Sequence, residues 1–240
     1  MELNRLAIAA VFCLGAASTS TNAADALPIV HDPRLVLELV AENPDIVTPI
    51  GLVFDQKKRL LVVESHTHFP PKNYAGPKAD RIRIVIDENG DGKADKFETF
   101  FEGSTHTMSL TPGPDDWLYV ATRMKIFRIR DKDGDGKADE QQDIIVMETK
   151  GNYPHNGLCG LCFDAAGALY FGQGENLGEA YTLIGTDGAK LSGGGEGGNI
   201  FRCKADGSAL QRVATGVWNP FAIVFDNTGR MFTVDNDPDG

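Results

Sequence analysis

The sequence reads DENGDGKAD at residues 87–95 and DKDGDGKAD at residues 131–139, and seven of the nine positions are identical. The two copies begin 44 residues apart, at Asp87 and Asp131. Repeats of about 20–50 residues are typical of solenoids and propellers, in which one small unit recurs along the chain. This repeat therefore predicts a repeat architecture.

Strand-like segments flank both copies. Residues 81–86 and 125–130 precede the loops, and residues 97–101 and 144–147 follow them. These segments alternate with period two and are rich in β-branched or aromatic residues, a pattern that indicates strands. An EF-hand needs a helix on each side of its loop. We therefore expect both acidic loops to be hairpin turns.

The first loop has the ligand types of a calcium loop. Its candidate ligands are Asp87, Asn89, Asp91, Lys93, Asp95 and Glu98, with Gly92 at the sharp turn. The second loop offers Asp131, Asp133 and Asp135, but has Gln142 in place of the closing glutamate. Asp, Asn and Gly also form tight turns with no metal. Calcium binding and a plain turn both remain open for the first loop, and a plain turn is favoured for the second.

A second repeat runs along the whole chain. Apolar anchors recur at Leu61, Tyr119, Tyr170 and Phe232, which are 58, 51 and 62 residues apart. Each anchor belongs to a hairpin, and a second hairpin follows it. Four strands per unit of about 50 residues is the pattern of a propeller blade. The predicted fold is all-β, a β-propeller of the six-bladed, TolB-like kind.

The blade pattern predicts where the inner strands lie. They are expected near residues 52–55, 109–111, 161–164 and 223–226. Only about three and a half blades are present, so residues 25–240 are expected to be a partial propeller domain. A strand at residues 34–41 is expected to belong to the blade that closes the ring.

The N-terminus has the features of a signal peptide. Arg5 supplies a positive charge, residues 6–17 are apolar, and Thr21-Asn22-Ala23 has the small residues of a cleavage site. Residues 1–24 are therefore expected to direct export to the periplasm or outside the cell. No stretch has the roughly 20 apolar residues of a membrane span. The net charge of −11 argues against nucleic-acid partners and anionic membranes.

Propeller topology sorts the polar residues by face. Links inside each hairpin lie on one face, and the remaining links lie on the other, at the mouth of the channel. The sequence places at the mouth His66, His68, His106, His155, Glu175, Asn176, Trp218, Asn219 and Asp235. Convergent polar groups at a concave mouth are the usual first hypothesis for an active site. Each histidine could instead satisfy a local backbone group.

The cysteines and the glycine-rich run have structural interpretations. Cys159 and Cys162 are followed by Phe163, so they form no haem attachment motif. We expect Cys159, Cys162 and Cys203 to be buried thiols, with a Cys203 disulfide as the alternative. The glycine-rich run at residues 193–198 is not a phosphate loop, and it is expected to form a mobile link between residues 171 and 199 near the mouth.

Two segments resemble the soluble quinoprotein sugar dehydrogenases of the glucose and sorbosone type. Residues 153–158 leading into 161–175 are similar to a family segment in which a His starts an inner strand. Residues 218–221 with the following hairpin are similar to the family's Arg-Asn-Pro segment. The acidic turns, the glycine-rich run and the ending at Asp235–Pro238 most resemble the planctomycete-type membrane-bound dehydrogenase domain. The resemblance covers nearly all of the chain after residue 24.

The resemblance implies a cofactor, a substrate class and site residues. It implies pyrroloquinoline quinone, a small sugar or polyol substrate, and His155 as the general base. Asn219 and Trp218 would contact the quinone, and His106 is a third candidate contact at the mouth. Trp218 stands where the family has an arginine, and a tryptophan can stack on the quinone but cannot pair with a carboxylate.

The resemblance also implies calcium and an electron acceptor. Asp237 and Pro238 fall where the family holds an active-site calcium with backbone carbonyls. Family members often carry a downstream cytochrome c domain, so such a domain or another electron acceptor is an expected partner.

Two other function classes remain open. One is a non-catalytic, calcium-stabilised extracellular propeller that binds glycans or proteins, which Trp218 favours. The other is a metal-dependent lactonase, because six-bladed lactonases also place calcium at the channel. His155 and the cluster at the mouth favour the dehydrogenase.

Overall fold

The computed structural model describes residues 28–152 and 156–235, which form sixteen strands and, within those residues, no helix. The strands are β1 Pro49–Phe54, β2 Leu60–Glu64, β3 Asp80–Ile86, β4 Lys96–Ser104, β5 Thr107–Pro112, β6 Leu118–Thr122, β7 Lys125–Arg130, β8 Glu140–Thr149, β9 Leu158–Phe163, β10 Ala168–Gln173, β11 Tyr181–Gly185, β12 Lys190–Gly193, β13 Gly198–Lys204, β14 Gln211–Val217, β15 Ala222–Phe225 and β16 Met231–Val234. In this part of the chain, no helix could cross a membrane.

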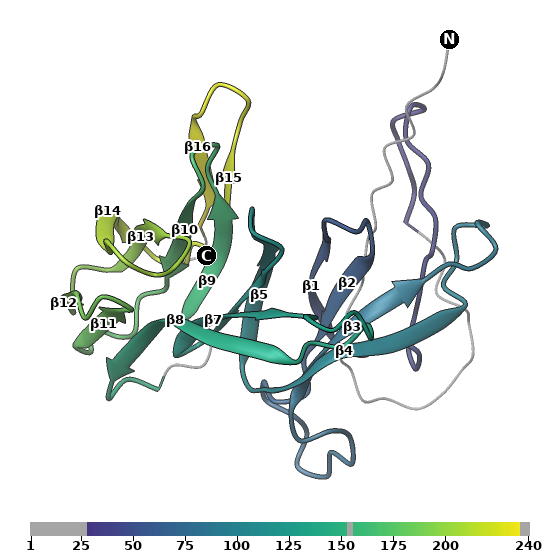
Figure 1. Cartoon of the computed structure of the whole chain (residues 1–240), viewed down its shortest axis with the longest axis horizontal. Helices are drawn as coiled ribbons and strands as arrows, with labels where there is room; N and C mark the ends of the chain where they lie inside the picture. Colours follow the sequence, from purple (N-terminus) through teal and green to yellow (C-terminus); the bar gives the residue numbers. More distant parts are fainter. Residues whose placement is uncertain (1–27, 153–155, 236–240) are drawn as a thin grey trace.

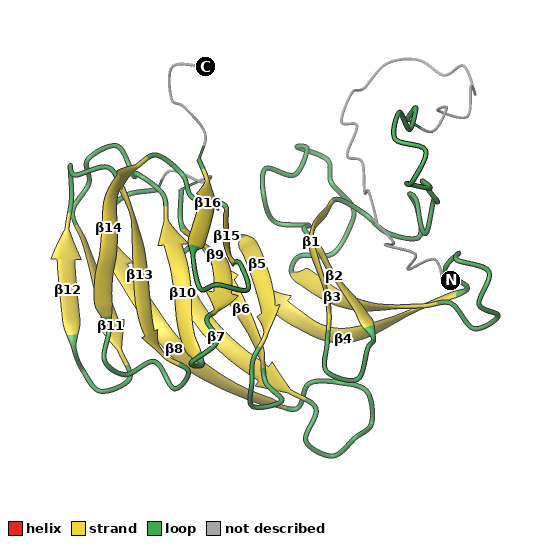
Figure 2. Cartoon of the chain, turned by 90° about the horizontal axis from the view of Figure 1, so that it is seen from above, coloured by secondary structure: helices red, strands yellow, loops and turns green. Residues whose placement is uncertain are grey.

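The strands form successive antiparallel blades. The first blade is β1–β4, the second contains β5–β8, the third is β9, β10, β13 and β14, and β15 with β16 begins a fourth. The first strands contact one another in turn, β1 with β5, β5 with β9, and β9 with β15. Figure 1 shows the blades side by side, and Figure 2 shows their strands from above. The all-β propeller prediction is confirmed, and the four expected inner strands fall on β1, β5, β9 and β15.

The apolar core lies between the faces of neighbouring blades. Leu61, Val63 and Ile82 of the first blade pack with Val120 and Phe127 of the second. A larger cluster joins the second and third blades through fully buried side chains, among them Tyr119, Phe171 and Phe201. Burying one such side chain stabilises a fold by about 1.5–3 kcal/mol. Each blade therefore depends on its neighbour for its core.

The acidic loops join each blade to the preceding element. The Ala138 amide in the second loop donates to the Phe100 carbonyl of β4, over 2.8 Å. In the first loop, Ala94 donates in the same way to the Val40 carbonyl, over 2.9 Å. Val40 thus occupies the place of an outer strand. Residues 34–41 form no strand pairing within the described chain, and their assignment to the closing blade stays a prediction.

The long link between β10 and β13 is not the loose glycine-rich loop that the sequence suggested. It folds as the hairpin β11–β12, and β11 pairs with β8 to extend the second blade to six strands. Glu196 holds the glycine-rich end, because it accepts the Tyr181 hydroxyl at 2.7 Å and pairs with Arg212 at 3.3 Å. Gly195 and Gly197 have φ values of 85° and 84°, which favour glycine.

The described cysteines are free thiols. Cys159 and Cys203 are buried, and burial raises the pKa of each thiol to about 12. Cys162 is half-buried, and desolvation raises its pKa as well. The prediction of core thiols is confirmed for Cys159 and Cys203, and the alternative of a Cys203 disulfide is not found. Protonated thiols are poor nucleophiles and metal ligands.

Candidate functional site

The links predicted at the mouth do lie at one end of the strands. His66 and His68 lie in the β2–β3 link, and His106 lies in the β4–β5 link. Trp218 and Asn219 lie in the β14–β15 link. The signal peptide, His155, Asp237 and Pro238 lie outside the described residues, so their assignments remain predictions.

Asp80, at the start of β3, organises the mouth between the first two blades. Its side chain is fully buried. Oδ1 accepts the backbone amides of His66 and Thr67, at 2.7 and 2.9 Å, and the Thr67 hydroxyl at 2.9 Å. Oδ2 accepts the Thr107 amide at 2.8 Å, which ties the second blade to the first. The sequence offered no signal for this role, because Asp80 resembles any turn residue that precedes a strand.

His66 belongs to a second buried network beside Asp80. Glu64, 1% exposed, pairs with Arg81 at 3.2 Å and with Arg83 at 2.9 Å. Arg81 Nη2 lies 3.2 Å from His66 Nε2, and a guanidinium can only donate. Nε2 therefore accepts, so the proton of the neutral imidazole lies on Nδ1, which faces the Tyr74 hydroxyl. This arrangement leaves the Tyr74 O–H free to donate to another group.

His68 and His106 form the next part of the mouth. Their rings lie edge to face, 6.4 Å between centroids. The His106 amide donates to the Thr67 hydroxyl at 2.7 Å, and its φ is +51°. Non-glycine residues rarely adopt this conformation, and strain of this kind gathers at functional sites. The backbone of His106 is thus fixed by contacts rather than by local preference.

Two mouth histidines have depressed pKa values. Desolvation is the main cause for both His66 and His106, and the positive charge of Arg81 or Arg123 adds to it. The unfolded chain therefore binds protons at these positions more readily than the folded chain. Folding stability contributed by the neutral imidazoles is present above the ordinary value of 6.5 and is lost as pH falls below it.

The melting temperature should therefore fall as pH is lowered from about 7.5 to 5.5, as these histidines begin to take up protons. In His66→Gln, which removes one of these groups, the fall should be smaller. Thermal unfolding followed by circular dichroism at several pH values tests this expectation. A melting temperature that rises on acidification would contradict it.

Between the third and fourth blades, the mouth is held together by hydrogen bonds of asparagine side chains and backbone amides. Asn219, 1% exposed, donates through its side chain to Asn156 Oδ1 at 2.9 Å. The Asp235 carboxylate accepts the backbone amides of Trp218, at 2.8 Å, and Asn219, at 2.6 Å. Asn156 in turn donates to the Glu175 carbonyl. Asn219 therefore holds the β14–β15 link in place. The half-buried Trp218 precedes it and offers an aromatic ring at this part of the mouth.

The acidic loops lie on the opposite face and share one hydrogen-bond pattern. Asp87 accepts the amides of Gly90 and Gly92, and Asp131 accepts those of Gly134 and Gly136. These bonds lower the pKa of both carboxyls, although desolvation opposes them and is the largest single effect at Asp131. The predicted hairpin turns are confirmed.

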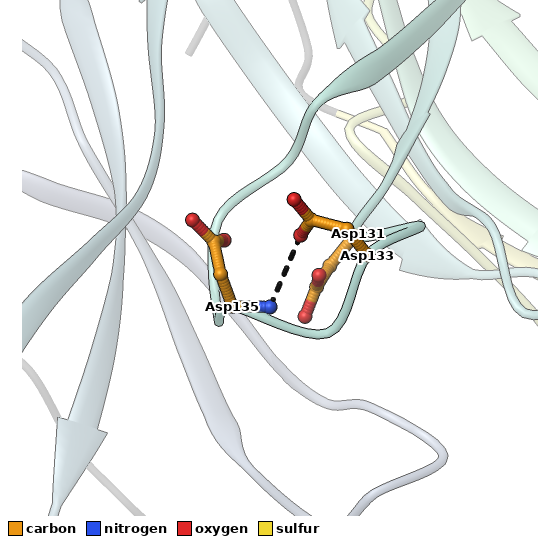
Figure 3. Close-up of side chains that lie close together, drawn as sticks. All are labelled: Asp131, Asp133 and Asp135. Carbon is orange, nitrogen blue, oxygen red and sulfur yellow. Dashed lines mark hydrogen bonds between the residues drawn. The ribbon is translucent and has the colours of Figure 1, made fainter.

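The second loop brings three carboxylates together. One oxygen each of Asp131, Asp133 and Asp135 lies within 4.8 Å of the others. Figure 3 shows the three side chains on the one loop. Hard oxygen donors of this kind suit calcium. The residues at the closing position are already engaged, since Glu98 pairs with Lys96 at 2.5 Å and Gln142 accepts from Arg128 at 2.7 Å. The convergent cluster therefore lies in the loop that the sequence favoured less.

A cavity of about 330 Å³ also lies on this opposite face, between the first two blades. Its charged lining is largely paired. Arg59 lies 2.7 Å from Asp55, and Lys57 lies 3.7 Å from Asp131. Arg130, also in the lining, pairs with Glu140 at 2.7 Å. Because these charges neutralise one another, the mouth is the stronger candidate site.

Arg123 is the mouth residue that sequence reasoning missed. It lies in the two-residue link between β6 and β7, and its backbone amide donates to the His106 carbonyl at 3.0 Å. A single arginine in a short link belongs to no sequence motif. Arg123 is recognised as a mouth residue only from the residues that lie beside it in the folded chain.

Solved structures with a similar fold include three from enzymes. An enzyme of carbohydrate-active family AA12 from Trichoderma reesei has a TM-score of 0.58 and 14% identity, over 83% of this chain and 47% of that one; its calcium structure is similar too. The holo PQQ domain of pyranose dehydrogenase from Coprinopsis cinerea has a TM-score of 0.54 and 13% identity, over 80% of this chain and 44% of that one. A gluconolactonase from Xanthomonas campestris has a TM-score of 0.50 and 14% identity, over 83% and 58%.

These likenesses show a shared fold and no more, because the identities are low. The chain spans about half the length of the first two of these proteins. No curated protein matches the sequence. One family model does match, over residues 21–239, and it describes a domain of unknown function, DUF7133. The match covers most of the sequence, and the chain therefore belongs to the DUF7133 family.

Proposed function

We propose that this propeller acts on a sugar or polyol at its channel mouth, as an exported quinoprotein-like dehydrogenase. The observation that carries the proposal is the mouth itself. There, links from successive blades bring together His66, His68, His106 and Arg123 around a buried polar frame. The similar folds of a PQQ domain and of a carbohydrate-active enzyme are consistent with this substrate class. Residues 1–24 are the proposed export signal.

The residues at the mouth fit pyrroloquinoline quinone, a planar group that carries carboxylates. The partly buried Trp218 offers a stacking face, and imidazole and guanidinium groups offer donors to carboxylates. Bound there, the quinone would accept a hydride from the substrate carbon. We propose that His155 removes the proton from the substrate hydroxyl, because it immediately precedes Asn156 of the buried frame.

The proposed activity is tested directly with purified protein, quinone and calcium. We expect reduction of an artificial electron acceptor that depends on a sugar or polyol. A panel of hexoses, pentoses and polyols covers the substrate class. A cytochrome c domain or another protein would accept the electrons naturally. If no member of the panel gives quinone-dependent turnover, the dehydrogenase proposal fails.

One observation favours a second candidate, a non-catalytic calcium-stabilised propeller that binds glycans or proteins. The cluster of Asp131, Asp133 and Asp135 lies far from the mouth, where calcium could stabilise the fold but could not take part in chemistry. The calcium structure of the Trichoderma reesei enzyme shows only that a protein of similar fold was studied with this ion. In this second candidate, the mouth would bind a ligand without turnover.

Calcium should bind the acidic loops weakly, on the order of 0.1–1 mM, as in extracellular modules. Calorimetric titration of wild type, Asp91→Ala and Asp135→Ala separates the two loops. The heat should diminish more in Asp135→Ala, because the carboxylates converge in the second loop. A wild type that gives no heat and no thermal stabilisation would show that both loops are only turns.

A further inference from the structure

The arginines of the described chain are nearly all held by partners. Of ten, eight form ion pairs with carboxylates. Arg202 is held instead by Gln211 Oε1, at 2.8 Å. Arg123 is the exception, because its guanidinium has no side-chain or carbonyl partner among the described residues, and its Nε is shielded from solvent. The shielded Nε–H has lost water without gaining an acceptor, and a ligand at the mouth would supply one.

The position of Arg123 is fixed at the mouth from two sides. Its amide donates to the His106 carbonyl at 3.0 Å, and its carbonyl accepts the Leu158 amide at 3.2 Å. The side-chain stem packs on Gly157, where an added Cβ would lie 2.5 Å from Arg123 Cγ. Gly157 directly precedes the inner strand β9. The guanidinium stem therefore runs beside the channel strand of the next blade.

The surroundings of Arg123 favour an anion. Its charge is felt at His106, whose pKa it helps to lower, and His106 lies against His68 at 6.4 Å between ring centroids. Asp80, a buried carboxylate of the mouth, is already occupied by four donors. A guanidinium matches a carboxylate with two parallel hydrogen bonds, more closely than it matches a neutral hydroxyl.

We propose that Arg123 is a binding residue that anchors a carboxylate of the ligand at the channel mouth. The inference rests on the proposed function, since it identifies what that site holds. The carboxylate could come from the quinone cofactor or from a sugar acid as substrate. In either case, the cation that recognises it stands on the β6–β7 link, on a different blade from Trp218.

Ligand binding measured by calorimetry tests this proposal. The probes are pyrroloquinoline quinone, glucuronate and, as the neutral counterpart, glucose. Wild type should bind at least one of the two carboxylate probes, and Arg123→Gln should weaken that binding about ten- to hundredfold, the usual effect of a charged hydrogen-bonding pair. The affinity of Arg123→Lys should lie between those of wild type and Arg123→Gln, because lysine keeps the positive charge but cannot make two parallel hydrogen bonds to a carboxylate. Glucose binding should not change.

Arg202→Gln, on the outer blade surface, is the matched control and should bind as wild type does. Because the Arg123 guanidinium holds no neighbour, the melting temperature of Arg123→Gln should equal that of wild type. Should that variant fail to fold, Arg123→Lys still tests the site through the loss of bidentate contact. Equal affinity of wild type and the Arg123 variants for both carboxylate probes would overturn the proposal, and so would a wild type that binds neither probe.

The outcomes separate this inference from the proposed dehydrogenase. Arg123-dependent binding of glucuronate without quinone binding supports a sugar-acid subsite and refutes the quinone. Arg123-dependent binding of quinone alone assigns the residue to the cofactor. Quinone-dependent turnover that is unaffected by Arg123→Gln supports the proposed dehydrogenase activity and overturns the proposal that Arg123 binds the carboxylate.

Discussion

Replacing Asp80 with alanine should destabilise the protein by about 3–5 kcal/mol, because each buried donor left without its acceptor costs about 1–3 kcal/mol. The fully buried carboxylate accepts four hydrogen bonds, and its removal leaves the amides of His66, Thr67 and Thr107 without their acceptor. For a chain of this size the melting temperature should fall on the order of 10 °C. Differential scanning calorimetry measures it.

Two variants set the scale for Asp80→Ala. Asp80→Asn keeps one acceptor oxygen but places an NH2 group against a backbone amide, so its melting temperature should lie between those of wild type and Asp80→Ala. Asp143→Ala removes a half-exposed carboxylate that pairs with Lys125 at 3.0 Å, and should change stability by less than about 1 kcal/mol. Equal melting temperatures for Asp80→Ala and Asp143→Ala would refute the role assigned to Asp80.

Replacing His155 with alanine should reduce turnover about a hundredfold or more, the usual contribution of a positioned general base. Substrate and quinone binding should change far less, because the base acts on the proton in the transition state. The measurement is steady-state kinetics with an artificial acceptor, beside quinone binding for the same variant. His31→Ala, in the exposed N-terminal segment, is the matched control and should keep full activity. Intact turnover in His155→Ala would exclude this residue as the base.

The sequence predicted the repeating part of the fold well, because strand alternation and turn chemistry are local. Asp55, Asp164 and Asp226 show why. Each follows a first strand and accepts the amides of the turn after it, so the same residue recurs wherever the turn does. These aspartates stand six residues before the anchors Leu61, Tyr170 and Phe232, so the spacing of the anchors located the same hairpins without knowledge of any tertiary contact.

Features that depend on contacts between blades could not be predicted. The hairpin β11–β12 forms because β8 offers an open edge, and nothing within residues 181–193 identifies that partner. Residues 34–41 alternate like a strand but have no strand beside them in the described chain. Arg123 and Asp80 are significant only through neighbours that are distant in the sequence. The links that hold His66, His68 and His106, in contrast, lie where they were predicted, since their face follows from strand order alone.

The central claim is that a quinone binds at the mouth beside Trp218, and tryptophan fluorescence tests it most directly. The chain has two tryptophans, Trp218 at the mouth and the buried Trp117, which lies against Arg130 on the opposite face. In Trp117→Phe, titration with pyrroloquinoline quinone and calcium should quench the remaining fluorescence strongly and saturate at one quinone per protein. In Trp218→Phe the quenching should be weak. Equal quenching in both variants, or no saturation in either, would contradict a quinone site at the mouth.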